Sequence, residues 1–133
     1  MERTLFLNGP MIGKVINMDF MKNIEKKLLF PFMDCFDHRP KERLLLEWND
    51  GTRIYTRLDT AGESQNEFDE DEEGFEEYFA CVMETVEIVS IGTAPVWNFE
   101  VGSLFELSYH NFPDFVRDSK GNILLEKSKL LAK

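Results

Sequence analysis

Residues 43–58, RLLLEWNDGTRIYTRL, decide the fold because they indicate two strands joined by a tight turn. Asn49-Asp50-Gly51 separates two runs rich in leucine, isoleucine, tyrosine and threonine, which favour strands. A three-residue loop with its glycine in the left-handed region forms a type I turn followed by a bulge. This register sets Glu47 opposite Arg53, whereas a two-residue loop would set Glu47 against Ile54. Because a matched cross-strand pair contributes about 0.2–1 kcal/mol, the sequence predicts the three-residue loop.

Downstream of this hairpin lies the most acidic segment of the chain, residues 63–77, ESQNEFDEDEEGFEE. It contains nine acidic side chains and no basic one. The whole chain has 25 acidic and 15 basic residues, so the remainder carries 16 acids against 15 bases. Nearly all of the net charge of −10 therefore lies in this run, which we expect to form an acidic loop at about 63–77.

The segments around the acidic run are less regular. Residues 59–62 are expected to leave the preceding strand, and residues 78–91, YFACVMETVEIVSI, follow the run. The start of this second segment fits a helical stripe, but its later part is rich in valine, isoleucine and threonine. We therefore predict a long strand over 78–91, with a helix as the alternative.

Two more strand patterns follow a predicted loop at 92–102. Residues 104–111 alternate between two faces, which carry Phe105, Leu107 and Tyr109 on one side and Glu106, Ser108 and His110 on the other. Residues 115–118 and 122–126 flank Ser119-Lys120-Gly121 and predict a second hairpin with glycine in the same role. Residues 127–133 are expected to form a short helix or a frayed end.

The N-terminal part predicts two short strands, over 4–7 and 11–18, and then one helix. Asp19 can cap a helix that begins at Phe20 and carries its apolar residues in one stripe. Pro31 is expected to end this helix near Leu29 or Phe30, because proline lacks the amide that a helix interior needs. Residues 32–36 are apolar and fit no single element.

The composition indicates one folded domain, residues 1–133, in a soluble, cytoplasmic protein. A hydrophobic content of 43% is sufficient for a packed core, and the apolar run Leu5–Leu7 is too short for a signal peptide or a membrane span. Cys35 and Cys81 are expected to be buried thiols, with one disulfide as the alternative. The acidic balance argues against nucleic acid and anionic membranes as partners, since both attract clustered lysine and arginine.

The acidic run contains part of a calcium-binding pattern, but a solvated acidic loop is the favoured interpretation. Asp69-x-Asp71-x-Glu73-Gly74 matches the opening of an EF-hand loop, but the twelfth position, which must supply a carboxylate, is Ala80. A zinc site would have to combine Cys35, His38, Cys81 and His110, of which only the first two have a usable spacing. We predict no metal ligand and no cofactor, and keep a weak divalent-cation site in the run as an alternative.

Glu106, Ser108 and His110 include the residue types of a catalytic triad. Residues two apart on a strand lie about 7 Å apart, too far for the hydrogen bonds of a triad. We predict no catalytic residue and expect a protein that is not an enzyme.

Surface recognition fits the acidic run best, because carboxylates interleaved with aromatic rings combine long-range attraction with anchoring contacts. The predicted partner-binding residues are Glu67, Phe68, Asp69, Glu70, Asp71, Glu72, Glu73, Phe75, Glu76, Glu77 and Tyr78. In size and charge the chain resembles small acidic bacterial immunity proteins, although no sequence motif carries the resemblance. It implies a protein that neutralises a basic toxin, such as a nuclease.

We therefore predict an α+β domain with a mostly antiparallel, meander-like sheet and one or two helices on one face. Its predicted function is non-catalytic binding of a basic protein. A structural or accessory domain without a separable site is the alternative.

Overall fold

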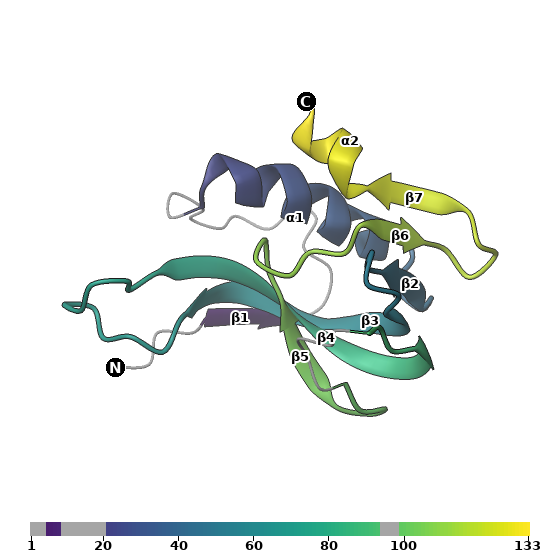
Figure 1. Ribbon diagram of the computed structural model, residues 1–133, viewed down its shortest axis with the longest axis horizontal. Coiled ribbons are helices and arrows are strands. Elements are labelled where there is room, and N and C mark those ends of the chain that lie inside the picture. Colours follow the sequence, from purple (N-terminus) through teal and green to yellow (C-terminus); the bar gives the residue numbers. More distant parts are fainter. Residues whose placement is uncertain (1–4, 9–20, 94–98) are drawn as a thin grey trace.

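The computed structural model describes residues 5–8, 21–93 and 99–133 (Figure 1). Its elements, in chain order, are β1 (Leu5–Asn8), α1 (Asn23–Asp37), β2 (Leu44–Glu47), β3 (Arg53–Gln65), β4 (Glu77–Ser90), β5 (Leu104–Leu107), β6 (Phe115–Arg117), β7 (Ile123–Glu126) and α2 (Lys127–Leu131). The predicted strand over 11–18, the Asp19 cap and the start at Phe20 lie outside the described residues.

The strands form one antiparallel sheet in the order β5-β4-β3-β2-β6-β7. β1 and β2 share one edge of β3, where β1 pairs with residues 60–63 and β2 pairs with residues 53–56. α1 lies across one face of the sheet, and α2 lies beside it after β7 (Figure 1). The predicted α+β class, with an antiparallel sheet and two helices on one face, is confirmed.

The hairpin at 43–58 has the predicted three-residue loop. Its register has the pairs Glu47–Arg53, Leu46–Ile54 and Leu45–Tyr55. Gly51 has φ of 99°, in the left-handed region that favours glycine, and Arg53 Nε donates to Glu47 Oε2 at 2.7 Å.

β3 does not end at Leu58 as predicted but continues to Gln65. β1 pairs with one edge of residues 60–63 and β4 with the other, so the backbone there is hydrogen-bonded on both sides. β4 is the predicted long strand. The β3–β4 pairing shifts register between Arg53 and Ile54, between Tyr55 and Thr56, and between Leu58 and Thr60, and from Thr60 to Gln65 it is regular.

The prediction that Pro31 ends the helix is wrong, because α1 runs through it to Asp37. Losing one helical hydrogen bond at proline costs about 3 kcal/mol. Against this cost, five large apolar side chains on the two sides of the proline are buried in the core. They are Leu28, Leu29, Phe32, Met33 and Phe36. Full burial of one such side chain contributes about 1.5–3 kcal/mol, so packing outweighs the proline penalty.

The C-terminal part follows the prediction with one correction. β6 and β7 form the second hairpin, with Gly121 at φ of 90°, and α2 is the expected short helix. The predicted strand over 104–111 is wrong beyond Leu107, because the Ser108 backbone amide donates to Asn111 Oδ1 and closes a turn there. In the part of the chain that the structure describes, no helix has the length and hydropathy needed to cross a bilayer.

Candidate functional site

The acidic run lies on the long β3–β4 hairpin. Residues 63–65 belong to β3 and Glu77 belongs to β4, so the connecting loop is shorter than the predicted 63–77. We call Glu67–Gly74 the acidic tip, and Figure 1 shows it at one end of the molecule, away from α2 and β7. Its exposed carboxylates are Glu67, Asp69, Glu70, Asp71, Glu72 and Glu73.

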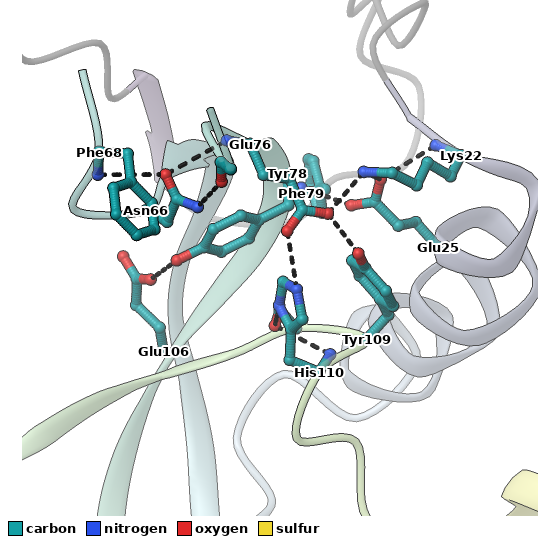
Figure 2. Close-up of polar contacts among 12 residues, drawn as sticks. Lys22, Glu25, Asn66, Phe68, Glu76, Tyr78, Phe79, Glu106, Tyr109 and His110 are labelled. Atoms are coloured by element: carbon teal, nitrogen blue, oxygen red, sulfur yellow. Dashed lines mark hydrogen bonds and ion pairs between the residues drawn. The ribbon is translucent and has the colours of Figure 1, made fainter. Parts of the chain in front are cut away.

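Asn66 closes the base of the acidic tip. Its side-chain amide donates to the Gly74 carbonyl at 2.8 Å, and its Oδ1 accepts from the Phe68 and Glu76 amides at 3.4 and 3.2 Å (Figure 2). The Asn66 amide also donates to the Glu76 carbonyl at 3.1 Å. One side chain therefore bonds to residues at both ends of the loop between β3 and β4, so the tip has a defined conformation.

Phe68 presents an aromatic ring among the carboxylates. It is 39% exposed, and a β-carbon built on Gly74 would lie 3.5 Å from the ring. Gly74 has φ of 92°, so a residue with a side chain would be strained at this position. The turn is completed by the Glu72 amide, which donates to the Asp69 carbonyl at 2.9 Å.

Glu76 differs from the carboxylates of the tip because it is neutralised within the molecule. Lys22 Nζ lies 2.7 Å from its Oε2, His110 Nε2 lies 2.9 Å from its Oε1, and the Tyr109 hydroxyl donates to Oε2 (Figure 2). Burial acts to raise the pKa of Glu76, but the hydrogen bonds from Lys22 and Tyr109 and the charge of His110 outweigh it and lower the pKa. Glu76 thereby joins the start of α1, the base of the hairpin and the turn after β5.

Glu25 makes a second connection between α1 and the hairpin. Its side chain is fully buried and accepts from the Phe79 amide of β4 at 2.6 Å and from the Lys22 amide at 3.0 Å. By accepting from the Lys22 amide, Glu25 also satisfies one of the donors at the helix N-terminus that have no partner within the helix. The end of the β3–β4 hairpin next to the acidic tip is therefore fixed to α1 by hydrogen bonds as well as by packing.

Glu106 lies next to the same end of the hairpin. The Tyr78 hydroxyl donates to its Oε1 at 3.1 Å and the Ser64 hydroxyl donates to its Oε2 at 3.0 Å. Burial and the neighbouring carboxylate of Glu106 raise the pKa of Tyr78. Tyr78 therefore keeps its proton near neutral pH and remains a donor to Glu106.

Ser108 and His110 are in contact, so the expected separation of about 7 Å between their side chains is wrong. Because β5 ends at Leu107, the Ser108 hydroxyl lies 3.1 Å from His110 Nδ1, while the other ring nitrogen faces Glu76. Ser108 is only 5% exposed, and its oxygen also accepts from the His110 amide at 3.2 Å. This arrangement holds the turn and shields the hydroxyl from a substrate, so we assign it no reaction.

The metal-ligand sets considered from the sequence are not brought together. In residues 5–8, 21–93 and 99–133, no three side chains of histidine, cysteine, aspartate or glutamate are grouped so that they could hold an ion. Ala80, at the twelfth position of the EF-hand pattern, is fully buried in β4. Cys81 is also fully buried, and burial raises its thiol pKa far above the usual range.

Most of the residues that support the tip were not recognised from the sequence. They are Lys22, Glu25, Ser64, Asn66, Glu106, Tyr109 and His110. They come from α1 and the residue before it, β3 and the residue after it, β5 and the turn after β5, so no local spacing connects them. The alternation over 104–111 was the available signal for Glu106 and His110, and it was interpreted only as a possible catalytic set.

Comparison with known proteins gives one family. No curated protein and no solved structure matches the chain. The model of the family described as cognate immunity protein YxxD matches residues 29–129, from the middle of α1 to α2, and so includes the whole β3–β4 hairpin and the tip. Since this match covers well over half of the sequence, the chain belongs to the YxxD family of cognate immunity proteins.

Proposed function

We propose that this protein binds and inhibits a basic toxin, and that the acidic tip is its main contact. The family match supports an immunity role, and the exposed carboxylates of the tip support the choice of this surface. Six exposed carboxylates occupy a segment of eight residues that contains no lysine or arginine. A nuclease is the sharpest form of this proposal, because an enzyme that binds nucleic acid must present basic side chains to phosphate.

The arrangement of the tip suits fast and specific association. Clustered charge of one sign attracts a partner of opposite sign over roughly one Debye length, about 8 Å at physiological ionic strength, and raises the association rate. Phe68 supplies apolar area at the centre of this charge, as interfaces with aromatic anchors do. Because Asn66 already orders the loop, binding would require little further loss of backbone entropy.

The eleven predicted partner-binding residues divide into two groups in this proposal. Residues 67–73 contact the toxin. Phe75, Glu76, Glu77 and Tyr78 are half-buried at the base of the hairpin, where Glu76 is already paired with Lys22. We propose that this second group mainly holds the tip in position.

The experiment compares two triple variants with the same loss of charge. The tip variant is Glu67→Gln, Asp71→Asn and Glu73→Gln, and the control is Glu42→Gln, Asp59→Asn and Glu100→Gln, three exposed acids outside the run. The toxin is first sought among the products of the genes beside the one for this chain, by their binding to the wild-type protein, and each variant is then tested against the purified toxin domain. Binding kinetics are measured at about 50 and 500 mM salt, together with inhibition of the toxin, since salt screens exposed charges.

We expect the tip variant to bind about 30-fold more weakly at low salt, mainly through slower association, while the control changes affinity by less than about threefold. The difference between the variants should shrink at high salt. Equal effects of the two variants would mean that the tip has no special role. A wild-type protein that neither binds nor inhibits the toxin would contradict the proposed function itself.

A further inference from the structure

We propose that Glu106 is a preorganised acceptor for one arginine side chain of the toxin, a contact separate from the acidic tip. The inference rests on the proposed function, because it assumes a basic protein partner. It assigns a second element, β5, to the binding surface and gives it a defined chemistry.

Glu106 is an exposed carboxylate that is nevertheless held in one orientation. Ser64 of β3 and Tyr78 of β4 are directly opposite each other in the sheet, and both hydroxyls donate to Glu106. Ser64 is 4% exposed, so one of the two donors is anchored in the protein interior. An exposed glutamate without such donors would have to lose rotamer freedom when it binds a partner.

The two hydroxyls leave Glu106 suited to a two-pronged donor. Tyr78 uses one lone pair of Oε1 and Ser64 uses one lone pair of Oε2, so each oxygen retains accepting capacity. A guanidinium presents two parallel N–H groups that match two carboxylate oxygens, whereas a lysine ammonium acts as a point charge. The geometry therefore favours arginine.

Glu106 also has no cation among its contacts in the described residues, which consist of the two hydroxyl donors to its side chain. The nearby Glu76 is the contrasting case, since it already contacts Lys22 and His110. Figure 2 shows the two carboxylates on opposite sides of Tyr78, whose ring also contacts the His110 ring with centroids 5.1 Å apart. Of these two carboxylates, one is neutralised internally and the other is available to a partner.

The position of Glu106 fits a division of roles with the tip. Ser64 and Tyr78 stand one residue pair inside Gln65 and Glu77, the last pair of the hairpin before the loop. A toxin attracted by the tip would thus lie close to Glu106, which contacts the end of the hairpin next to the tip. The tip should govern mainly association, and Glu106, with its fixed geometry, should govern mainly dissociation.

The test uses the same toxin domain and four variants: Glu106→Gln, Tyr78→Phe, their combination, and Glu100→Gln as the control for loss of one exposed glutamate. Glu106→Gln keeps the size of the side chain and an oxygen for one hydroxyl, but its amide group opposes a guanidinium. Each arginine on the toxin surface is also changed to lysine, and coupling is measured in double-mutant cycles. Melting temperatures show that the variants are folded.

We expect Glu106→Gln to raise Kd about 30-fold through faster dissociation, with the association rate within about twofold of wild type. Tyr78→Phe should raise Kd about fivefold, and the combination should be no weaker than Glu106→Gln alone, because the hydroxyl acts through the carboxylate. One toxin arginine should lose its effect when Glu106 is replaced. Glu100→Gln should change Kd by less than twofold.

Three results would overturn the inference. If Glu106→Gln binds as wild type while the tip variant binds weakly, the inference fails and the proposed function stands. If Glu106→Gln weakens binding but no toxin arginine is coupled to it, the assignment of arginine fails. If the wild-type chain does not bind the toxin, the proposed function and the inference fail together.

Discussion

Carboxylates at the two ends of β3 have different surroundings. Beside the start of β3, Glu47 lies 2.7 Å from Arg53 and also pairs with Arg117. Beyond its end, the acidic tip consists of exposed carboxylates in a segment without any basic residue. We call Glu25, Glu47 and Glu76 the frame carboxylates, because each accepts hydrogen bonds from a distant part of the chain.

This difference means that the number of acidic residues in a segment does not by itself identify a binding surface. Frame carboxylates accept from donors in distant parts of the chain and should matter for folding, while tip carboxylates have exposed side chains and should matter for association. Four experiments test whether the two groups of carboxylates differ in this way.

The largest effect is expected at Glu25. Replacing Glu25 by alanine removes the acceptor of two backbone amides, those of Lys22 and Phe79, and the second is buried. A buried donor without an acceptor costs about 1–3 kcal/mol, so we expect the free energy of unfolding to fall by about 3 kcal/mol in urea denaturation. Glu25→Gln, which keeps one acceptor oxygen, should lose less; an equal loss in both variants would contradict this account.

Glu47→Ala should have the next largest effect, a loss of about 2 kcal/mol in the free energy of unfolding, because it leaves two arginines without their shared partner. The side chain of Glu47 is 17% exposed, so solvent reduces the penalty below that of a fully buried pair. Glu42→Ala is the matched control, since Glu42 is exposed and lies 3.8 Å from Arg39. It should cost less than about 0.5 kcal/mol.

Stability should also depend on pH through Glu47 and Glu76. Burial acts to raise the pKa of Glu47, but hydrogen bonds and charges of Arg117 and Arg53 outweigh it and lower the pKa, as Lys22 and Tyr109 do for Glu76. The unfolded chain therefore takes up protons first. The contribution is complete above the ordinary value of 4.5 and is lost as pH falls through the lower folded-state pKa values.

The measurement is urea denaturation between neutral and acidic pH. The double variant Glu47→Gln and Glu76→Gln should lose less stability on acidification than wild type, because neither amide titrates. A parallel decline in both proteins would assign the acid sensitivity to other carboxyls.

The smallest effect on stability is expected from the tip. The variant Glu67→Gln, Asp71→Asn and Glu73→Gln should change the free energy of unfolding by less than about 0.5 kcal/mol, with a slight gain if mutual repulsion is relieved. Calorimetry at low and high salt measures this. A loss above about 1 kcal/mol would place these residues with the frame carboxylates and remove the basis of the comparison.

The sequence predicted the parts of the fold that depend on neighbouring residues. Both three-residue hairpin loops were found because turn glycine and strand alternation lie within about ten residues of each other. The continuation of α1 through Pro31 was missed because core packing decides it. The continuation of β3 to Gln65 was missed because β1 and β4 supply its hydrogen bonds.

The sequence predicted an acidic segment as the candidate site, but it did not separate the exposed carboxylates from the one that is paired within the molecule. Composition located the acidic run, yet it treated Glu76 as equivalent to Glu70 or Glu73. The partners of Glu76 are 54 and 34 residues away, at Lys22 and His110. Glu106 was missed for the same reason, since its donor Ser64 is 42 residues distant.

The uneven register of β3 and β4 affects how the hairpin is aimed. All three register shifts lie between Arg53 and Thr60, and the stretch from there to Gln65 pairs regularly. Bulges are the places where a pair of strands bends and coils more strongly, while a regular ladder stays straight. The pairing of β3 with β4 is therefore irregular over residues 53–60 and regular from there toward the acidic tip. A change in the bend at these residues would move the whole acidic tip as one unit relative to the rest of the sheet.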